Sequence, residues 1–320
     1  MSHIIEVDNL KKYFGKREKL VKAVDGISLK IREKEIFGFL GPNGAGKTTS
    51  LRMIIGLLKP DAGKISIMGQ DPHKNGKDLK KKLGIIPQSL TFYNDLTVEE
   101  NLWFLANIYD IPKELAMQRI DSLIEKVGLE DKRKRLARTL SGGLQRRLNL
   151  ILGLVHDPSI ILCDEPTPGL DPQSRVAVWD LIRELPKQGK TVILTTHFME
   201  EADRLSDRVA IIDHGKILVL DTPSKLKASI GEGDLVEFIL SSDDQQFLEK
   251  ISSLLKDFSG IEDSYTSSGR IIIRSLDVVP RLSRILNYIE NEGALVENMA
   301  IRSTTLEDVF INITGRALRN

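Results

Sequence analysis

The sequence has little of several features that define other classes of protein. Its 320 residues include one cysteine, which excludes a disulfide framework and fits a reducing compartment. No apolar run approaches the roughly 18 residues that a bilayer-spanning helix needs, and residues 1–16 lack the unbroken apolar core of a signal peptide. These absences predict a cytosolic chain that reaches a membrane only through a partner.

The charge balance argues against nucleic acid as a partner. The chain carries 46 Lys and Arg against 45 Asp and Glu, a formal net charge of +1, so it has no overall basic character. The dense basic runs at residues 80–82 and 132–135 contain no interleaved aromatic residues, and we interpret them as solvated faces. We therefore expect no nucleic-acid partner.

The first two thirds of the chain predict an α/β domain over residues 1–222. Amphipathic stretches separate short apolar runs typical of buried strands, which occur at 36–40, 64–69, 83–87, 159–163, 190–196, 208–213 and 216–220. Residues of about 88–156 are mostly helical in pattern. Because the apolar strands lie far apart in sequence, this stretch is predicted to be a helical subdomain inserted into one sheet-based domain.

The composition changes near Pro223 and Ser224, which we interpret as a linker. The following residues alternate in the order strand, helix, strand, strand, helix, strand, which is the split βαβ arrangement. The predicted elements are, in this order, 234–240, 245–258, 261–266, 269–275, 280–291 and 294–301. Residues 223–320 are therefore predicted to form a small α+β accessory domain with a regulatory or structural role. They contain no convergent acids, no His/Cys cluster and no glycine-rich loop.

A glycine-rich segment follows the apolar run at 36–40 and precedes a helical run. Its sequence GPNGAGKT, residues 41–48, fits the phosphate-binding pattern G-x-x-x-x-G-K-[ST]. In this pattern backbone N–H groups surround phosphate oxygens, Lys47 reaches the β- and γ-phosphates and Thr48 ligates Mg²⁺. A chance glycine-rich turn is the alternative, and the flanking strand and helix argue against it. The predicted nucleotide-binding residues are Gly41, Pro42, Asn43, Gly44, Ala45, Gly46, Lys47, Thr48 and Thr49.

Two adjacent acids end the apolar run SIILCDEP at residues 159–166. Neighbouring residues of a strand point to opposite faces, so Asp164 and Glu165 cannot both be idle surface charges. We expect Asp164 to hold Mg²⁺ through water and Glu165 to polarise the attacking water. The alternative is an ordinary strand end with solvated acids. Cys163 is interpreted as a small buried hydrophobic residue and not as a nucleophile.

A third segment, LSGGLQRRL at residues 140–148, precedes a helical run. Ser141, Gly142 and Gly143 would present a hydroxyl and bare amides at a helix N-terminus, which is a natural phosphate site. The local chemistry fits a plain helix cap equally well. The segment on its own leaves both interpretations open.

Together the three segments resemble the ATP-binding subunit of an ATP-binding cassette (ABC) transporter. The short interval between Lys47 and Asp164 resembles that family's compact arrangement and leaves no space for a long coiled-coil arm. The resemblance implies a P-loop NTPase core with a helical subdomain, ATP and Mg²⁺ as cofactors, and hydrolysis of ATP to ADP and phosphate.

The same resemblance implies roles for single residues. Gln88 is similar to the Q-loop glutamine that touches Mg²⁺ and senses the membrane partner, Asp171 in PGLD to the D-loop aspartate that bridges two subunits, and His197 to the switch histidine at the γ-phosphate. Phe14 lies where the family places an aromatic ring against adenine, with Tyr13 as the alternative. Taken alone, Gln88 could be a surface amide, His197 a satisfied loop residue and Phe14 part of the core.

Two positions depart from the family pattern. Leu144 stands where a glutamine is usual in the signature segment, so only residues 141–143 are expected to contact nucleotide. Pro168 stands where a serine is usual in the D-loop.

The resemblance also implies partners. Two copies would pair head to tail as a homodimer with two ATP sites at the interface, on the cytoplasmic face of the cell membrane, and would power a separate multi-span permease. The C-terminal segment TLEDVFINITGR resembles the end of drug-resistance exporter ATPases. The alternative is an ABC-type ATPase that energises a non-transport process, in a regulatory membrane complex or on the ribosome.

A candidate contact with the permease follows Gln88. Leu90, Phe92 and Tyr93 lie in a turn-like stretch where large apolar side chains are unfavourable in water. Folding back into the core is the equally good alternative.

Overall fold

The computed structural model describes residues 2–15, 20–74, 76–231, 233–242, 244–267, 269–276 and 278–315. The chain divides into two compact units, residues 1–223 and 224–319. Among the described residues, none of the helices combines the length and the apolar character that crossing a bilayer requires.

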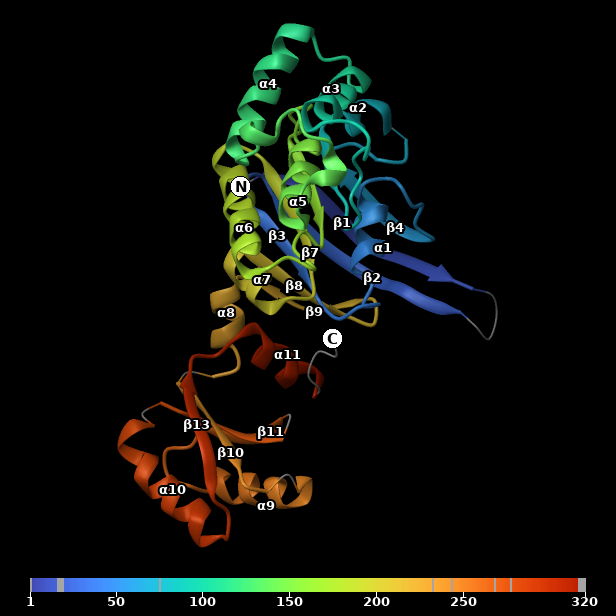
Figure 1. Ribbon diagram of the computed structural model, residues 1–320. Helices are drawn as coiled ribbons and strands as arrows, with labels where there is room; N and C mark the ends of the chain where they lie inside the picture. Colours follow the sequence, from blue (N-terminus) through green and yellow to red (C-terminus); the bar gives the residue numbers. More distant parts are fainter. Residues whose placement is uncertain are drawn as a thin grey trace. The chain divides into compact units, whose positions relative to one another are not determined.

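The first unit is built around a six-stranded sheet in the order β5-β6-β7-β3-β8-β9. Its strands β3, β7, β8 and β9 are labelled in Figure 1. All neighbouring pairs are parallel except the pair of β8 and β9. The strands in chain order are β3 (Ile36–Leu40), β5 (Leu83–Ile86), β6 (Ile160–Asp164), β7 (Thr191–Thr196), β8 (Arg208–Asp213) and β9 (Lys216–Asp221). Every residue of β3 and β7 is buried, as expected for central strands of a parallel sheet that is covered on both faces.

Two apolar clusters cover the two faces of this sheet. In β6, Ile161 and Cys163 belong to one cluster and Ile160 and Leu162 to the other, because successive side chains of a strand alternate between faces. The second cluster also fills the space under a three-stranded antiparallel sheet, β2-β1-β4. Its strands are β1 (His3–Phe14), β2 (Val21–Arg32) and β4 (Ala62–Ile67).

Most helices of the first unit contribute to the cluster that contains Cys163. The insertion between β5 and β6 holds α3 (Val98–Ile108), α4 (Lys113–Lys126), the short 3₁₀ turns Glu130–Lys132 and Ala137–Thr139, and α5 (Gly142–Leu152), as the sequence predicts. Thr97 and Glu100 form a reciprocal capping box at the start of α3. The remaining helices are α1 (Lys47–Ile54), α2 (Gly76–Lys80), α6 (Pro172–Lys187) and α7 (Met199–Leu205).

The second unit has the predicted βαββαβ order. It contains α8 (Pro223–Ala228), β10 (Asp234–Leu240), α9 (Gln245–Lys256), β11 (Asp263–Ser267), β12 (Arg270–Ser275), the 3₁₀ turn Val279–Arg281, α10 (Leu282–Asn291), β13 (Val296–Arg302) and α11 (Leu306–Thr314). The four strands form an antiparallel sheet in the order β11-β12-β10-β13, and residues of α9 and α10 complete its apolar core. The fold class predicted from the sequence is confirmed in both units.

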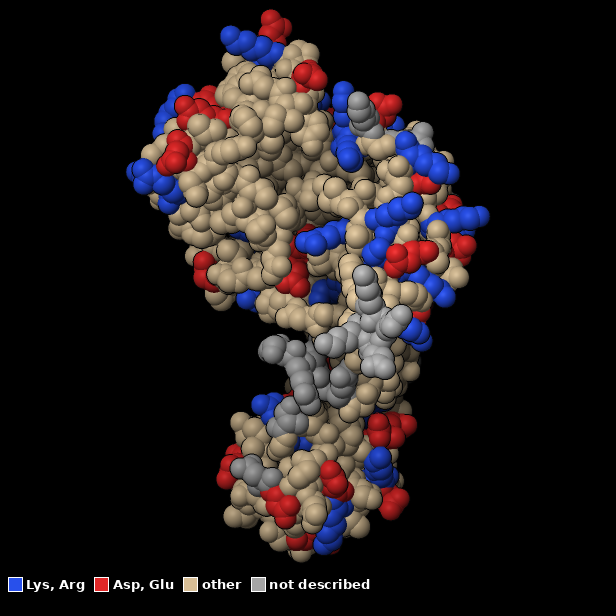
Figure 2. Space-filling view, turned by 90° about the vertical axis from the view of Figure 1, so that its right-hand side faces the viewer, with Lys and Arg blue, Asp and Glu red and all other residues tan. Residues whose placement is uncertain are grey.

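Charged side chains of both signs are interspersed on the visible face of each unit (Figure 2). On that face no stripe of Lys and Arg runs without interruption by Asp and Glu or uncharged residues.

Candidate functional site

The glycine-rich segment forms a tight loop between β3 and α1. Gly44 and Gly46 adopt φ angles of 82° and 105°, in the left-handed region that L side chains rarely enter. A Cβ atom on Gly46 would lie 2.3 Å from the Ala23 carbonyl oxygen, so only glycine fits this close approach. The loop borders a cavity of about 400 Å³, which is lined by Ala23, Asn43, Gly44, Gly46, Lys47, Thr48, Thr49, Gln88, Glu165, Pro168 and His197.

Lys47 begins α1 and lies buried at the floor of this cavity. Its ammonium donates to the carbonyl oxygens of Gly41 at 2.7 Å and Pro42 at 3.1 Å, and it lies 3.6 Å from Glu165 Oε1. Burial lowers the pKa of Lys47, and the negative charge of Glu165 acts in the opposite direction. The ammonium is therefore held inside the curve of the loop.

The Asp164 carboxylate lies beside two hydroxyl groups. Thr48 Oγ1 donates to Asp164 Oδ1 at 3.1 Å, and the Thr195 hydroxyl donates to the same oxygen. A hydroxyl and a carboxylate are oxygen ligands of the kind that Mg²⁺ prefers. Among the described residues there is no group of three or more His, Cys, Asp and Glu side chains that could hold a metal ion. In proteins Mg²⁺ commonly takes only one or two side-chain ligands and keeps several water molecules.

Glu165 is the point on which the predicted residues converge. Gln88 Nε2 donates to Glu165 Oε2 at 3.2 Å, and His197 Nδ1 lies 3.2 Å from Glu165 Oε1. The Glu165 side chain is buried, and its φ angle of 47° is in the left-handed region. Its backbone N–H donates to the carbonyl and to the hydroxyl of Thr195, at 3.0 and 3.2 Å.

The segment 141–143 begins α5 and is not among the residues that line this cavity. Ser141 has extended backbone angles at the N-cap position, but its side chain makes no capping hydrogen bond, so its hydroxyl remains accessible. Ser141 and Gly142 are exposed. Asp171 caps α6 and accepts hydrogen bonds from Ser174 N–H and Oγ, which lower its pKa.

The two candidate aromatic residues differ in their environment. Phe14 ends β1 and is exposed, with the Lys12 ammonium 5.7 Å from its ring centroid. The Tyr13 hydroxyl donates to Asp25 at 2.9 Å, and this hydrogen bond raises the pKa of Tyr13. The ring of Phe14 is therefore the more accessible of the two.

Several polar residues that support the site were not predicted from the sequence. Thr195 holds both Asp164 and the backbone of Glu165. Glu201 on α7 accepts hydrogen bonds from Thr167 Oγ1 at 2.7 Å and Trp179 Nε1 at 3.0 Å, and burial raises its pKa. Arg146 reaches the loops of Gln88 and Glu165. Two features of the sequence could have indicated them. Thr195 is a hydroxyl residue in a mostly apolar strand, and Glu201 and Arg146 are charged residues in amphipathic helices.

The chain is similar in sequence to known proteins over most of its length. The family profile described as "ABC transporter" matches residues 24–168. "Nod factor export ATP-binding protein I" of Ralstonia nicotianae is 36% identical over 317 residues, which cover 99% of this chain and 95% of that protein. "Linearmycin resistance ATP-binding protein LnrL" of Bacillus subtilis is 35% identical, with 99% and 100% covered. "Daunorubicin/doxorubicin resistance ATP-binding protein DrrA" of Streptomyces peucetius is 35% identical, with 92% and 88% covered.

Solved structures show the same fold. An ATP-binding subunit of an ABC transporter superposes with a TM-score of 0.63 at 26% identity, covering 71% of this chain and 93% of that one. A dimeric ATP-binding cassette in a post-hydrolysis state, bound to ADP and Pi, superposes with a TM-score of 0.62 at 28% identity, covering 68% and 98%.

Proposed function

Because this chain belongs to the ABC transporter family and is an ATPase of that family, we propose that it powers an exporter whose membrane-spanning permease is a separate chain. The observation that carries the proposal is the convergence of Lys47, Gln88 and His197 on the Glu165 carboxylate beside the glycine-rich loop. Relatives named for export or drug resistance match both units, over nearly their full length.

In this proposal the loop binds the phosphates of ATP. The N–H groups of residues 41–49 surround the phosphate oxygens, and Lys47 exchanges its hydrogen bonds with Gly41 and Pro42 for contacts with the β- and γ-phosphates. Thr48, Asp164 and Gln88 would hold Mg²⁺, which neutralises phosphate charge when it is bound. Phe14 would stack against the adenine base.

Hydrolysis requires a water molecule aligned with the γ-phosphate. Glu165 accepts a hydrogen bond from that water and polarises it, while Gln88 orients the carboxylate. His197 lies on the other carboxylate oxygen and is placed to contact the γ-phosphate. The buried setting of Glu165 strengthens each of these interactions, because few water molecules screen them.

The segment 141–143, in which Ser141 and Gly142 are exposed, would complete the second half of the site in a partner copy together with Asp171. The complete motif set in one chain supports a homodimer that closes on two ATP molecules. After hydrolysis, charge repulsion between ADP and phosphate would open the dimer.

Substitution of the proposed catalytic carboxylate tests this function. Glu165→Gln should lower turnover at least 100-fold and stabilise an ATP-dependent dimer, because nucleotide still binds but is not hydrolysed. Phosphate release and light scattering with and without ATP measure both effects. Glu184→Gln, at an exposed position of α6, is the matched control and should behave as wild type.

Capture of the ATP-bound Glu165→Gln chain from detergent-solubilised native membranes then tests the transport role. A multi-span membrane protein at comparable stoichiometry is expected. Ribosomal or other soluble partners without a membrane protein would favour the non-transport alternative. Undiminished turnover in Glu165→Gln would instead contradict the assignment of the catalytic residue.

We place the permease contact at Leu90 and Tyr93. Both side chains are exposed two and five residues after Gln88, and the Tyr93 ring packs edge-on against Phe104, 4.7 Å between centroids. Phe92 packs instead against the apolar core, so the sequence hypothesis applies to two of its three residues. Exposed neighbouring apolar side chains are typical of protein interfaces.

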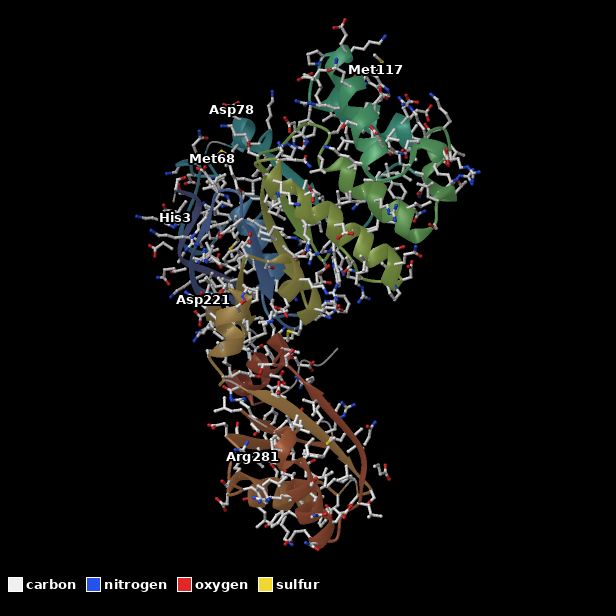
Figure 3. All side chains as sticks on the ribbon, turned by 90° about the vertical axis from the view of Figure 1, so that its left-hand side faces the viewer. His3, Met68, Asp78, Met117, Asp221 and Arg281 are labelled. Atoms are coloured by element: carbon white, nitrogen blue, oxygen red, sulfur yellow. The ribbon has the colours of Figure 1, made fainter. Side chains whose placement is uncertain are left out.

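Polar replacement tests this contact. Leu90→Ser with Tyr93→Ser should release the chain from native membranes, by at least 10-fold in a co-sedimentation assay, while basal ATPase activity changes less than twofold. The control is Met117→Ser, at an exposed apolar position on α4 (Figure 3). Equal release of the control, or unchanged association of the double variant, would reject the location.

A further inference from the structure

Arg146 lies in the second turn of α5, five residues after Ser141, and its side chain is buried. Its guanidinium donates to four backbone carbonyl oxygens from two separate loops. One pair belongs to Pro87 and Gln88, at 2.9 and 3.0 Å, and the other to Glu165, at 2.7 Å, and Pro166. Two of these acceptors are the backbones of the proposed catalytic residues themselves.

Burial of the Arg146 guanidinium removes water from a charged group, which is unfavourable unless hydrogen bonds replace that water. No carboxylate pairs with it among the salt bridges of the described residues, and burial lowers its pKa. Hydrogen bonds to carbonyl oxygens therefore replace the lost hydration. Nε and both terminal nitrogens are used, which only the planar fork of arginine can do from one position.

The contact with Arg146 helps to hold Glu165 in an unusual backbone conformation. A φ angle of 47° at a non-glycine residue is strained and persists only where surrounding contacts enforce it. Thr195 accepts the N–H of Glu165 on one side, and Arg146 donates to its carbonyl oxygen on the other. The orientation of the carboxylate thus depends on both partners.

Building on the proposed function, we propose that Arg146 is a positioning residue for ATP hydrolysis. Its hydrogen bonds hold the backbones of Glu165 and Gln88 against α5. Arg146 itself does not line the cavity, and its hydrogen bonds go to the backbones of Gln88 and Glu165 and their neighbours, not to the glycine-rich loop. Its effect is to hold the water-polarising carboxylate and the Gln88 amide at their mutual distance. The helix that begins with residues 141–143 and the catalytic loops then move as one body.

Conservative substitutions separate positioning from stability. Arg146→Lys and Arg146→Gln should lower kcat by about 100-fold, because a displacement of about 1 Å at the reacting group has that effect, while the ATP dissociation constant changes less than threefold. The matched control is Arg147→Lys, whose parent side chain donates to the Val127 carbonyl and to neither catalytic loop. The control should retain wild-type kcat.

A second measurement excludes general damage. In a chain that already carries Glu165→Gln, Arg146→Lys should lower residual single-turnover hydrolysis less than threefold, because the group it positions is gone. An equal loss of about 100-fold in both backgrounds would contradict the proposal, as would wild-type kcat in Arg146→Lys. Loss of folding in both Arg146 variants, with Arg147→Lys folded, would assign Arg146 to the fold and overturn the positioning role.

The two proposals fail in distinguishable ways. Wild-type turnover in Glu165→Gln removes the proposed catalytic residue and with it this inference. Inactive Glu165→Gln together with fully active Arg146→Lys removes the positioning role alone.

Discussion

At the scale of single residues, Glu99 shows how one carboxylate joins two segments of the helical subdomain. It lies in the first turn of α3 and accepts hydrogen bonds from Arg133, at 2.7 Å, and from Lys134. These partners lower the pKa of Glu99 to about 2. A carboxylate near a helix N-terminus is also favoured by the helix dipole.

The direction of the shift sets a pH dependence. Because the folded pKa lies below the unfolded value of about 4.3, the contribution of Glu99 to stability is complete above that value and is lost as the pH falls toward 2. Glu99→Gln should lower the free energy of unfolding by about 2 kcal/mol at pH 7 and reduce the loss of stability between pH 5 and 3. Urea unfolding at several pH values measures both.

The exposed Glu114, in the first turn of α4, supplies the control for this variant. Glu114→Gln should leave the pH profile of stability almost unchanged. Identical profiles for wild type and Glu99→Gln would show that the ion pairs contribute nothing measurable.

The side chains of the site could be predicted from the sequence, whereas the backbone contacts that support them could not. Lys47 and Glu165 were predicted from motifs, whereas Gln88 and His197 were predicted from the family resemblance. In the structure Lys47, Gln88 and His197 surround the Glu165 carboxylate. The acceptors of Arg146 could not be predicted, because they lie up to 59 residues away and are backbone oxygens, which leave no signature in the sequence. The left-handed φ of Glu165 was equally invisible, since glutamate does not favour it.

At the scale of elements, short apolar runs gave reliable strand predictions. The predicted run 36–40 coincides with β3, and 190–196 and 208–213 agree with β7 and β8 to within one residue. β1 and β2 were missed. Each spans 12 residues and carries two lysines, and register shifts along their pairing break the alternation of buried and exposed residues.

The elements of the second unit were recovered in order with small errors at their ends. The strand predicted at 234–240 coincides with β10, whereas α10 begins at Leu282, two residues after the predicted start at Pro280. A 3₁₀ turn over Val279–Arg281 takes up the difference. Proline fits the first turn of a helix, so the sequence could not distinguish a 3₁₀ start from an α-helical one.

At the scale of the whole molecule, we propose that residues 1–222 and 223–320 act as separate domains. The residues that line the nucleotide cavity all belong to the first unit, and the apolar core of α9, α10 and their sheet belongs to the second. A unit with its own core can fold alone.

Deletion of residues 223–320 tests this division. The truncated chain should bind ATP with an affinity within threefold of the full chain, while ATP-dependent dimerisation of its Glu165→Gln form weakens, because we assign the second domain a role in steadying the dimer. Calorimetry and light scattering measure the two quantities. Unchanged dimer affinity would contradict that role, and loss of ATP binding would contradict the independence of the first domain.

The lone cysteine has a practical consequence. Cys163 lies on β6 with no exposed surface, and burial raises the pKa of its thiol to about 12. Because the thiolate is the reactive form, the folded chain is inert toward maleimides and becomes reactive only when the central sheet opens. Cys163 therefore does not compete for thiol-reactive labels in the folded chain. A cysteine engineered at an exposed position can carry a fluorophore or spin label. A pair of such labels, one in each domain, can follow the distance between the domains during nucleotide turnover.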